Sequence, residues 1–237
     1  MAAPPFCKGR YRKDRITLAS GRYRIVSMAT KQRGRPRSFD RDEALEKALH
    51  AFWQHGYEAT SVADLTRVLG IGAPSLYAAF GDKKALFDAA VEAYATSDNG
   101  TFIDRALAEE PTAVAAFTRI LREAAVGYTA PDRPRGCMVL SVGVSATTPE
   151  VVAKMRELRA LNLAVMTARV QADVTAGVLP PGTDPEKLAT YAGAVLQGMS
   201  AQARDGADRE LLQRVAEVAA AGFAAAAEGR EVGASGA

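Results

Sequence analysis

From Asp40 onward, apolar side chains recur every three or four residues, which is the spacing of one face of an α-helix. The first such run begins at Asp40, has Glu43 three residues later, and ends before Gly56. An acceptor side chain followed three residues later by a carboxylate is typical of a helix N-terminus, and glycine suits the residue after a helix. We therefore expect a first helix over about 40–55.

Two shorter helical segments follow, separated by a turn that contains glycine. The capping pattern recurs at Ser61, and Gly70 ends the segment that begins there. Pro74, which is tolerated in the first turn of a helix, opens a very short helix that Gly81 closes, and Asp82 begins a fourth. Two short helices joined in this way form a helix-turn-helix, whose second helix can enter the major groove of DNA. On geometry alone, the same hairpin also suits a purely structural role.

Beyond about residue 98 the chain keeps the helical period and breaks at proline or glycine. Four further helices are predicted, over about 112–129, 149–176, 186–204 and 208–227. Residues 138–144 alternate and are rich in valine, so propensity alone favours a strand. A single strand would have no partner in a helical chain, and we therefore expect a helix there. The predicted fold class is all-α, without an internal repeat.

The composition is that of an ordinary globular chain. Of the 237 residues, 48% are hydrophobic and 24% are charged, which excludes disorder of the whole chain. The longest nearly apolar stretch, 218–227, is about half the length that a transmembrane helix needs. No apolar segment of a secretory signal follows the basic N-terminus. With only two cysteines, Cys7 and Cys137, we expect a protein of the reducing cytoplasm.

The net charge of +3 is an average over two parts of the chain. Residues 1–37 contain eleven basic side chains and one acidic one, a balance of +10, which leaves −7 for residues 38–237. Such an arm is expected to be flexible and to attract phosphate backbones or, as a weaker alternative, a membrane surface. The sequence leaves open whether 1–27 is an upstream extension before a start at Met28, in which case the arm carries +4.

Residues 33–95 carry a detailed pattern across four predicted helices. Its stretches are GRPR at 34–37, FWQHGY at 52–57, TSVADL at 60–65, GIGAPSLY at 70–77 and FGDKKAL at 80–86. In these residues and their spacing, the chain closely resembles the N-terminal domain of TetR/AcrR-family transcriptional repressors. The rest of the chain resembles the family only in being a helical domain of suitable length.

The resemblance implies an all-α regulator, with an N-terminal three-helix helix-turn-helix domain and a C-terminal helical domain for effector binding and dimerisation. The expected boundaries are a flexible arm at 1–37, the DNA-binding domain at 38–97, the helical domain at 98–228 and a flexible tail at 229–237. Such a protein forms an Ω-shaped homodimer, here through about 186–204 and 208–227, and binds a palindromic operator until a small-molecule effector releases it. The main alternative is a ligand-independent or architectural DNA-binding protein. No cofactor and no membrane partner are expected.

The resemblance also implies which residues contact DNA. Thr60 and Ser61 would cap the second helix while contacting phosphate, and Tyr77 and Lys83 would contact the phosphate backbone. The residues presented to the bases would be Gly72, Ala73, Pro74, Ser75 and Ala78.

The predicted recognition helix departs from the common pattern, since Ala78 and Ala79 stand where family members often carry bulky polar residues. It contains no Arg, Lys, Asn or Gln, so bidentate contacts to guanine or adenine are missing. Specificity would then depend on Ser75, main-chain groups, thymine methyl groups and DNA shape. We expect the arm to compensate by entering a minor groove or holding phosphates, through Arg33, Arg35 and Arg37.

An effector pocket is expected between helices of the C-terminal domain, although similar side chains usually form ordinary core. Its candidate lining residues are Phe102, Phe117, Leu121, Tyr128, Met138, Val142, Met155, Leu158, Met166 and Tyr191. The acidic charge of residues 38–237 argues weakly against a strongly anionic effector. For dimerisation, the candidates are small or apolar residues of the last two helices, namely Ala189, Ala192, Gly193, Leu196, Val215, Ala219, Ala220 and Phe223.

Cys137 follows a loop that contains Arg133 and Arg135. Two neighbouring guanidinium groups would lower the pKa of the thiol and favour a redox or electrophile sensor. A small, buried hydrophobic side chain is the simpler alternative.

The chain contains no recognisable pattern for catalysis or metal binding. It has no phosphate-binding glycine loop, no nucleophile elbow and no histidine-based acid/base set. His50 and His55, the two histidines, are five residues apart and have no cysteine or carboxylate at ligand spacing. We therefore expect neither an enzyme nor a metal site.

Overall fold

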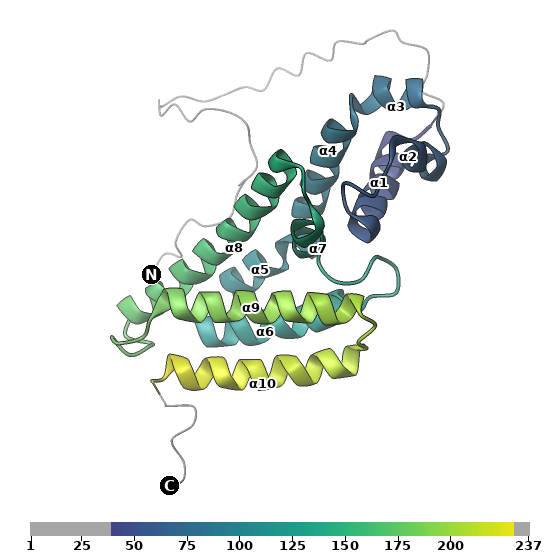
Figure 1. The fold of residues 1–237 in the computed structure, drawn as a ribbon. Helices are drawn as coiled ribbons and strands as arrows, with labels where there is room; N and C mark the ends of the chain where they lie inside the picture. Colours follow the sequence, from purple (N-terminus) through teal and green to yellow (C-terminus); the bar gives the residue numbers. More distant parts are fainter. Residues whose placement is uncertain (1–38, 230–237) are drawn as a thin grey trace, which may run out of the picture.

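A computed structural model describes residues 39–229, and within this range every regular element is an α-helix (Figure 1). The all-α prediction is confirmed. The predicted arm, with Arg33, Arg35 and Arg37, and all but the first residue of the predicted tail lie outside the described residues. The helices of the described part are α1 (Arg41–His55), α2 (Val62–Leu69), α3 (Ala73–Phe80), α4 (Lys83–Thr96), α5 (Asp98–Glu109), α6 (Ala113–Gly127), α7 (Met138–Ser145), α8 (Pro149–Thr175), α9 (Pro185–Arg204) and α10 (Arg209–Ala227).

The helix boundaries follow the caps that the sequence predicts. The Asp40 carboxylate starts α1 by accepting hydrogen bonds from two backbone N–H groups of the first turn, the nearer at 2.8 Å. Ser61 and Asp64 form a reciprocal capping box at the start of α2, and Gly70 ends that helix in the left-handed conformation, with φ 68°. The valine-rich segment is helical as predicted, since α7 buries one of its faces against α1 and α8.

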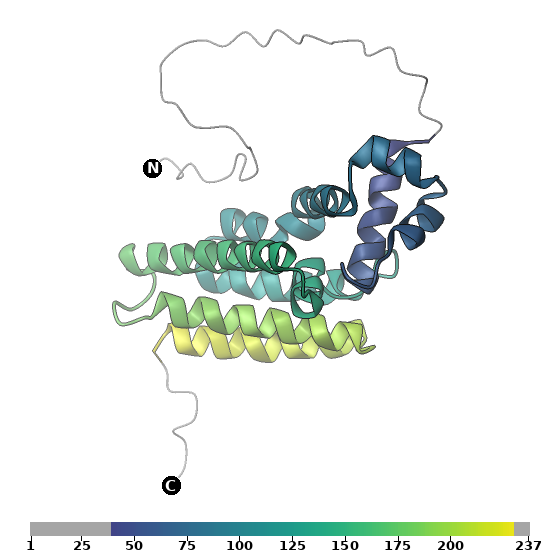
Figure 2. The same cartoon turned by 45° about the horizontal axis from the view of Figure 1, so that its top comes forward.

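The helices form two lobes (Figures 1 and 2). We call α1–α4 the first lobe and α5–α10 the helical body. In the body, α6, α9 and α10 pack side by side, and the stacked rings of Phe117 and Phe223, with centroids 4.1 Å apart, join α6 to α10. In the first lobe, α2 and α3 lie at the end that is farthest from α10 (Figure 1). None of the helices in 39–229 is long and apolar enough to cross a membrane.

The core of the first lobe extends beyond α4. It is built around Phe52 and Phe87, whose rings meet edge to face at 5.2 Å, and it also includes α7 and the first half of α8. From these later helices Met138, Val142 and Met155 are completely buried in the same core. Residues of the body thus close the apolar side of the first lobe.

Candidate nucleic-acid interface and internal cavity

α2 and α3 form the predicted helix-turn-helix. Their inward faces are held by Leu65 and Leu69 on α2 and by Leu76 and Phe80 on α3, all buried in the first-lobe core. Leu76 and Phe80 lie one helical turn apart, so they fix α3 along one side and leave its other side uncovered. The first lobe therefore presents α3 on its outer surface.

The uncovered side of α3 carries the residues that we predicted to face bases. Their exposure agrees with that role, although contact with DNA stays a prediction. Tyr77 is half exposed, at 50%, and no hydrogen bond of its hydroxyl lies within the described residues. The other exposed residues on or just before α3 are Gly72, Pro74, Ser75 and Ala78, and Ala73 is half buried.

The start of α2 corrects the prediction for Thr60. Ser61 alone caps this helix: its exposed hydroxyl accepts from the Asp64 N–H at 3.1 Å. Thr60 is only 1% exposed, and its hydroxyl donates inward to the Gly56 carbonyl at 2.7 Å. Because that hydroxyl satisfies the end of α1, the prediction that Thr60 caps α2 is wrong, and its hydroxyl does not reach the surface to meet a phosphate.

Two cations lie beside α3. Lys83 is the first residue of α4, and its Nζ lies 4.3 Å from the centre of the Tyr57 ring. Partial burial lowers the pKa of Lys83, and no carboxylate within 39–229 forms an ion pair with it. The Arg41 guanidinium lies 4.8 Å from the centre of the Phe80 ring, at the end of α3. Sequence reasoning missed Arg41, because nothing local indicates that the start of α1 meets the end of α3.

Glu58 connects the first lobe to the body. Its carboxylate accepts from the backbone N–H groups of Thr147 at 2.8 Å and Thr148 at 2.7 Å, and Thr148 is the N-cap residue of α8. Burial alone would raise the pKa of Glu58, but these N–H donors outweigh it and lower the pKa to about 2. The negative charge thus lies where the helix dipole of α8 favours an anion.

Arg204 makes the opposite connection. From the C-terminal end of α9, its guanidinium donates to the carbonyls of Trp53 at 3.2 Å and Gln54 at 3.3 Å, which belong to the last turn of α1. A cation there complements the negative end of the α1 dipole. Glu58 of the first lobe therefore binds the start of α8 in the body, and Arg204 of the body binds the end of α1 in the first lobe. Together these two contacts fix the orientation of α1–α4.

Replacing Glu58 with glutamine is expected to lower the free energy of unfolding by about 1 kcal/mol at pH 7, which is the usual cost of a lost helix cap. Because the folded-state pKa is depressed, this stabilisation is present above the ordinary value of 4.5 and is lost as the pH falls towards 2. Urea unfolding should therefore give a smaller gap between the two proteins at pH 3 than at pH 7. Glu157→Gln on α8 is the matched control, and an equal gap at both pH values would exclude the charge as the cause.

A cavity of about 1120 Å³ lies between the C-terminal end of α4 and helices α5, α7, α8 and α9. Four of the predicted pocket residues line it, namely Phe102, Tyr128, Leu158 and Met166, and Cys137 lines it as well. Its volume slightly exceeds the usual range for small-molecule sites, about 300–1,000 Å³. These residues thus share a cavity between helices of the body, and its occupation by an effector stays a prediction.

For the other six predicted pocket residues the prediction is wrong, since they do not line this cavity. Phe117 and Leu121 are buried where α6 packs on the other helices of the body, while Met138, Val142 and Met155 complete the first-lobe core. Tyr191 is 39% exposed on α9, and its hydroxyl donates to the Ala219 carbonyl of α10 at 3.4 Å. Helical spacing identified all six as apolar-face residues but could not tell which neighbour each face meets.

The surroundings of Cys137 overturn the predicted activation of its thiol. Burial raises the pKa of Cys137, and the hydrogen bond that the Tyr94 hydroxyl donates to Sγ at 3.2 Å lowers it only in part. Arg133 is occupied by Asp132 and Asn99, and Arg135 donates to the Ala207 carbonyl. Since neither arginine activates the thiol, we do not assign a sensor role to Cys137.

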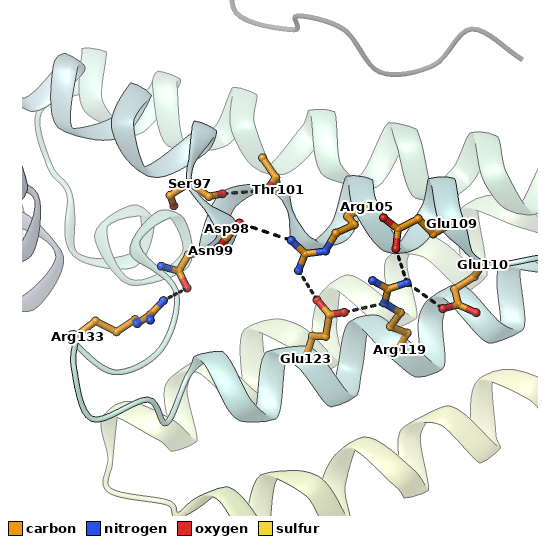
Figure 3. Close-up of polar contacts among 10 residues, drawn as sticks. All are labelled: Ser97, Asp98, Asn99, Thr101, Arg105, Glu109, Glu110, Arg119, Glu123 and Arg133. Carbon is orange, nitrogen blue, oxygen red and sulfur yellow. Dashed lines mark hydrogen bonds and ion pairs between the residues drawn. The ribbon is translucent and has the colours of Figure 1, made fainter.

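Two of the charged groups that α5 contributes to the cavity wall, Arg105 and Glu109, pair with side chains of α6 (Figure 3). Arg105 pairs with Glu123 at 2.9 Å and lies 3.7 Å from Asp98. Arg119 forms one ion pair with Glu123, at 2.7 Å, and another with Glu109 of α5, at 2.8 Å. This network ties α5 to α6 and leaves neither Arg105 nor Glu109 as a free charge for a ligand.

An exposed recognition helix, cations beside it and a cavity-bearing helical body define a class: helix-turn-helix regulators of transcription. Comparison with known proteins identifies the family. Residues 44–90 match the family model "Bacterial regulatory proteins, tetR family", and residues 113–219 match "Tetracyclin repressor-like, C-terminal domain". The chain belongs to the TetR family of transcriptional regulators, and it is a DNA-binding regulator and not an enzyme.

Individual relatives agree over most of their length. The HTH-type transcriptional repressor ComR of Escherichia coli is 35% identical over 188 residues, which cover 78% of this chain and 90% of ComR. The HTH-type transcriptional repressor BdcR of the same organism is 32% identical over 189 residues, with the same two shares. A solved structure of a cysteine variant of the regulator CifR, complexed with 26-base-pair double-strand operator DNA, is 39% identical, with a TM-score of 0.73. It covers 79% of this chain and 98% of the CifR chain.

Proposed function

We propose that this protein is a ligand-responsive transcriptional repressor, which binds a palindromic operator as a homodimer and leaves it when a small molecule enters the cavity. The observation that carries the proposal is the position of α7. This helix lines the cavity with Val139 and Leu140, while its buried Met138 and Val142 complete the first-lobe core. A ligand that moves α7 therefore also moves the lobe that presents α3.

Relatives support the repressor assignment. ComR and BdcR are both named transcriptional repressors, and the CifR structure contains operator DNA. On this basis, Ser61, Tyr77 and Lys83 would bind phosphates, and the exposed residues of α3 would face the bases. Arg41, which lies beside α3, would add a further phosphate contact.

For the dimer we propose the outer faces of α9 and α10, with different residues from those that the sequence suggested. Six of the eight suggested residues are buried within the body itself, namely Ala189, Ala192, Leu196, Ala219, Ala220 and Phe223. The outer face of α10 carries exposed Leu211 and Val218, with the partly buried Val215 between them. On α9 the small exposed residue Gly198 lies two helical turns from Tyr191 on the same side of the helix. A self-complementary apolar face of this kind suits a two-fold contact.

Footprinting on the DNA upstream of the gene tests the proposed function. A dimer of this kind should protect two half-sites, centred about one helical turn or a multiple of it apart. The lack of Arg, Lys, Asn and Gln on α3 favours one rival, an architectural protein that binds without strict sequence preference. Uniform coverage of the DNA would support that rival, as would an operator complex that no small molecule from the cell releases.

The basic arm is expected to make operator binding strongly dependent on salt. Deleting residues 1–37 should flatten the plot of log affinity against log salt concentration by about one unit for each phosphate that the arm neutralises. Deleting residues 1–27 alone is the matched control. This variant keeps Arg33, Arg35 and Arg37, so the part of the slope that these three arginines supply should remain. Fluorescence anisotropy from low to moderate salt measures all three slopes, and an unchanged slope without residues 1–37 would remove the arm from the mechanism.

A further inference from the structure

One cation in the cavity wall is left without a protein partner. Arg159 lies on α8 and lines the cavity. Within 39–229 its guanidinium has neither an ion pair with a carboxylate nor a hydrogen bond. The other charged residues of the wall are all engaged: Arg105 and Glu109 belong to the network with α6 (Figure 3), and Asp104 also has an interaction of its own. Arg159 is thus the charge that the fold leaves for a ligand.

The fold also makes room for this guanidinium. A Cβ atom added to Gly143 would lie 1.9 Å from Nη1 of Arg159, so any larger residue would displace the arginine. Glycine is unfavourable in a helix, and Gly143 lies within α7, where no turn or positive φ requires it. Nη1 of Arg159 packs against the α7 backbone at Gly143, beside the cavity.

A second polar group in the same cavity also lacks a partner. Tyr128 is 5% exposed and lines the cavity, but no hydrogen bond of its hydroxyl lies within the described residues. By contrast, the hydroxyl of Tyr94 donates to Cys137. A hydroxyl that lines the cavity without a partner in the described residues is free to donate to a ligand acceptor. Arg159 and Tyr128 thus both offer hydrogen-bond donors to a ligand, and neither side chain carries a negative charge.

The remaining wall is mostly apolar. The side chains that would meet the rest of a ligand are Phe102, Leu140, Leu158, Leu161, Leu163 and Met166. Such a wall suits a hydrocarbon body, while a single planar guanidinium suits one carboxylate better than a doubly charged phosphate.

We propose that the effector is an amphipathic organic monoanion, a carboxylate with an aliphatic or aromatic body, whose head pairs with Arg159. The Tyr128 hydroxyl, which lines the same cavity, serves as a second donor to the ligand. The proposal rests on the proposed function, since it names the class of molecule that the cavity of the repressor takes. The acidic balance of residues 38–237 argues only against strongly anionic effectors, and the local charge that faces the ligand is that of Arg159.

Three probes of equal length test the charge requirement on the full-length, unmodified protein. Octanoate, octanamide and octanol share a chain and differ in the head group. Octanoate is expected to raise the melting temperature and to bind at least about tenfold more tightly than the two neutral probes, measured by calorimetry at pH 7. Equal binding of all three would overturn the anion proposal, and so would a failure of octanoate to bind.

Variants locate the charge. Arg159→Met should remove the preference for octanoate over octanol, whereas Arg159→Lys should retain part of it. Arg156→Met, on an exposed position of the same helix, is the matched control and should leave the preference unchanged. A preference that survives Arg159→Met in a protein of normal circular dichroism would overturn the proposal.

Operator binding is measured in a separate assay, so that a failure of the proposed function can be told from a failure of the proposed anion site. If octanol and octanoate release the operator equally, the cavity is the effector site and the anion class is wrong. If a discrete operator is never found but octanoate still requires Arg159, the anion site stands and the proposed function fails.

Discussion

Replacing Ala78 with glutamate is expected to lower operator affinity by about two orders of magnitude, since each unfavourable base-edge contact costs about 1–3 kcal/mol and a carboxylate also repels nearby phosphates. Ala78 lies on the uncovered side of α3 and is exposed, so the substitution leaves the core of the first lobe intact. The fold should therefore persist while binding is lost.

Fluorescence anisotropy with a labelled operator measures this loss, and the melting temperature reports on the fold. Ala160→Glu is the matched control: it places the same charge on an exposed helical position of α8, away from α3. Its affinity should stay within about twofold of the unmodified protein, because it lies outside the footprint and only long-range, salt-screened charge acts there. Equal affinity of the Ala78→Glu and Ala160→Glu proteins would mean that this face of α3 does not meet DNA.

Replacing Val218 with glutamate is expected to convert the proposed dimer to a monomer and to lower operator affinity by about 100-fold or more. Val218 is 76% exposed on the outer face of α10, where no residue of 39–229 covers it. In a two-fold interface the substitution appears twice, so two carboxylates face the same apolar contact. A monomer also loses the second half-site, which the dimer binds at high effective concentration.

Analytical ultracentrifugation gives the mass, and the same anisotropy assay gives the affinity. Gln213→Glu, an exposed position of α10 nearly opposite to the Leu211–Val218 face, adds the same charge and should leave the dimer intact. A Val218→Glu protein that remains dimeric at micromolar concentration would place the interface elsewhere.

The local features of the fold could be predicted from the sequence because they depend on neighbours along the chain. Asp40 and Ser61 cap α1 and α2 as their spacing indicated. The exposed side of α3 could also be identified, since Leu76 and Phe80 leave only one side of so short a helix free.

What the sequence could not provide was the partner of each apolar face. Met155 and Leu158 lie one turn apart on α8, yet Met155 is sealed in the first-lobe core and Leu158 reaches the cavity as well. Ala189 and Phe223 have the same apolar character as the exposed Val218, but they face the inside of their own body. Periodicity gives the direction of a side chain on its helix, whereas the choice between core, cavity and interface depends on how the helices cross.

The contacts between the lobes were also beyond reach. Glu58 binds the start of α8 about 90 residues later in the chain, and Arg204 binds the end of α1 about 150 residues earlier. Nothing in the local sequence of either residue marks it as a partner for a distant helix end. The same holds for Arg159 and Gly143, whose fit depends on α7 packing against α8.

The shared core of the first lobe limits how such a regulator can be recombined. A chimaera that joins residues 39–97 to the body of another protein would lose Met138, Val142 and Met155 and would leave the apolar side of α1 and α4 uncovered. A viable exchange would have to carry the segment 138–158 along with the DNA-binding helices. That segment also supplies Val139, Leu140 and Leu158 to the cavity. Part of the specificity of the proposed effector site is therefore inherited together with operator specificity. Tyr128, Cys137 and the α5, α9 and later α8 walls are free to diverge on their own.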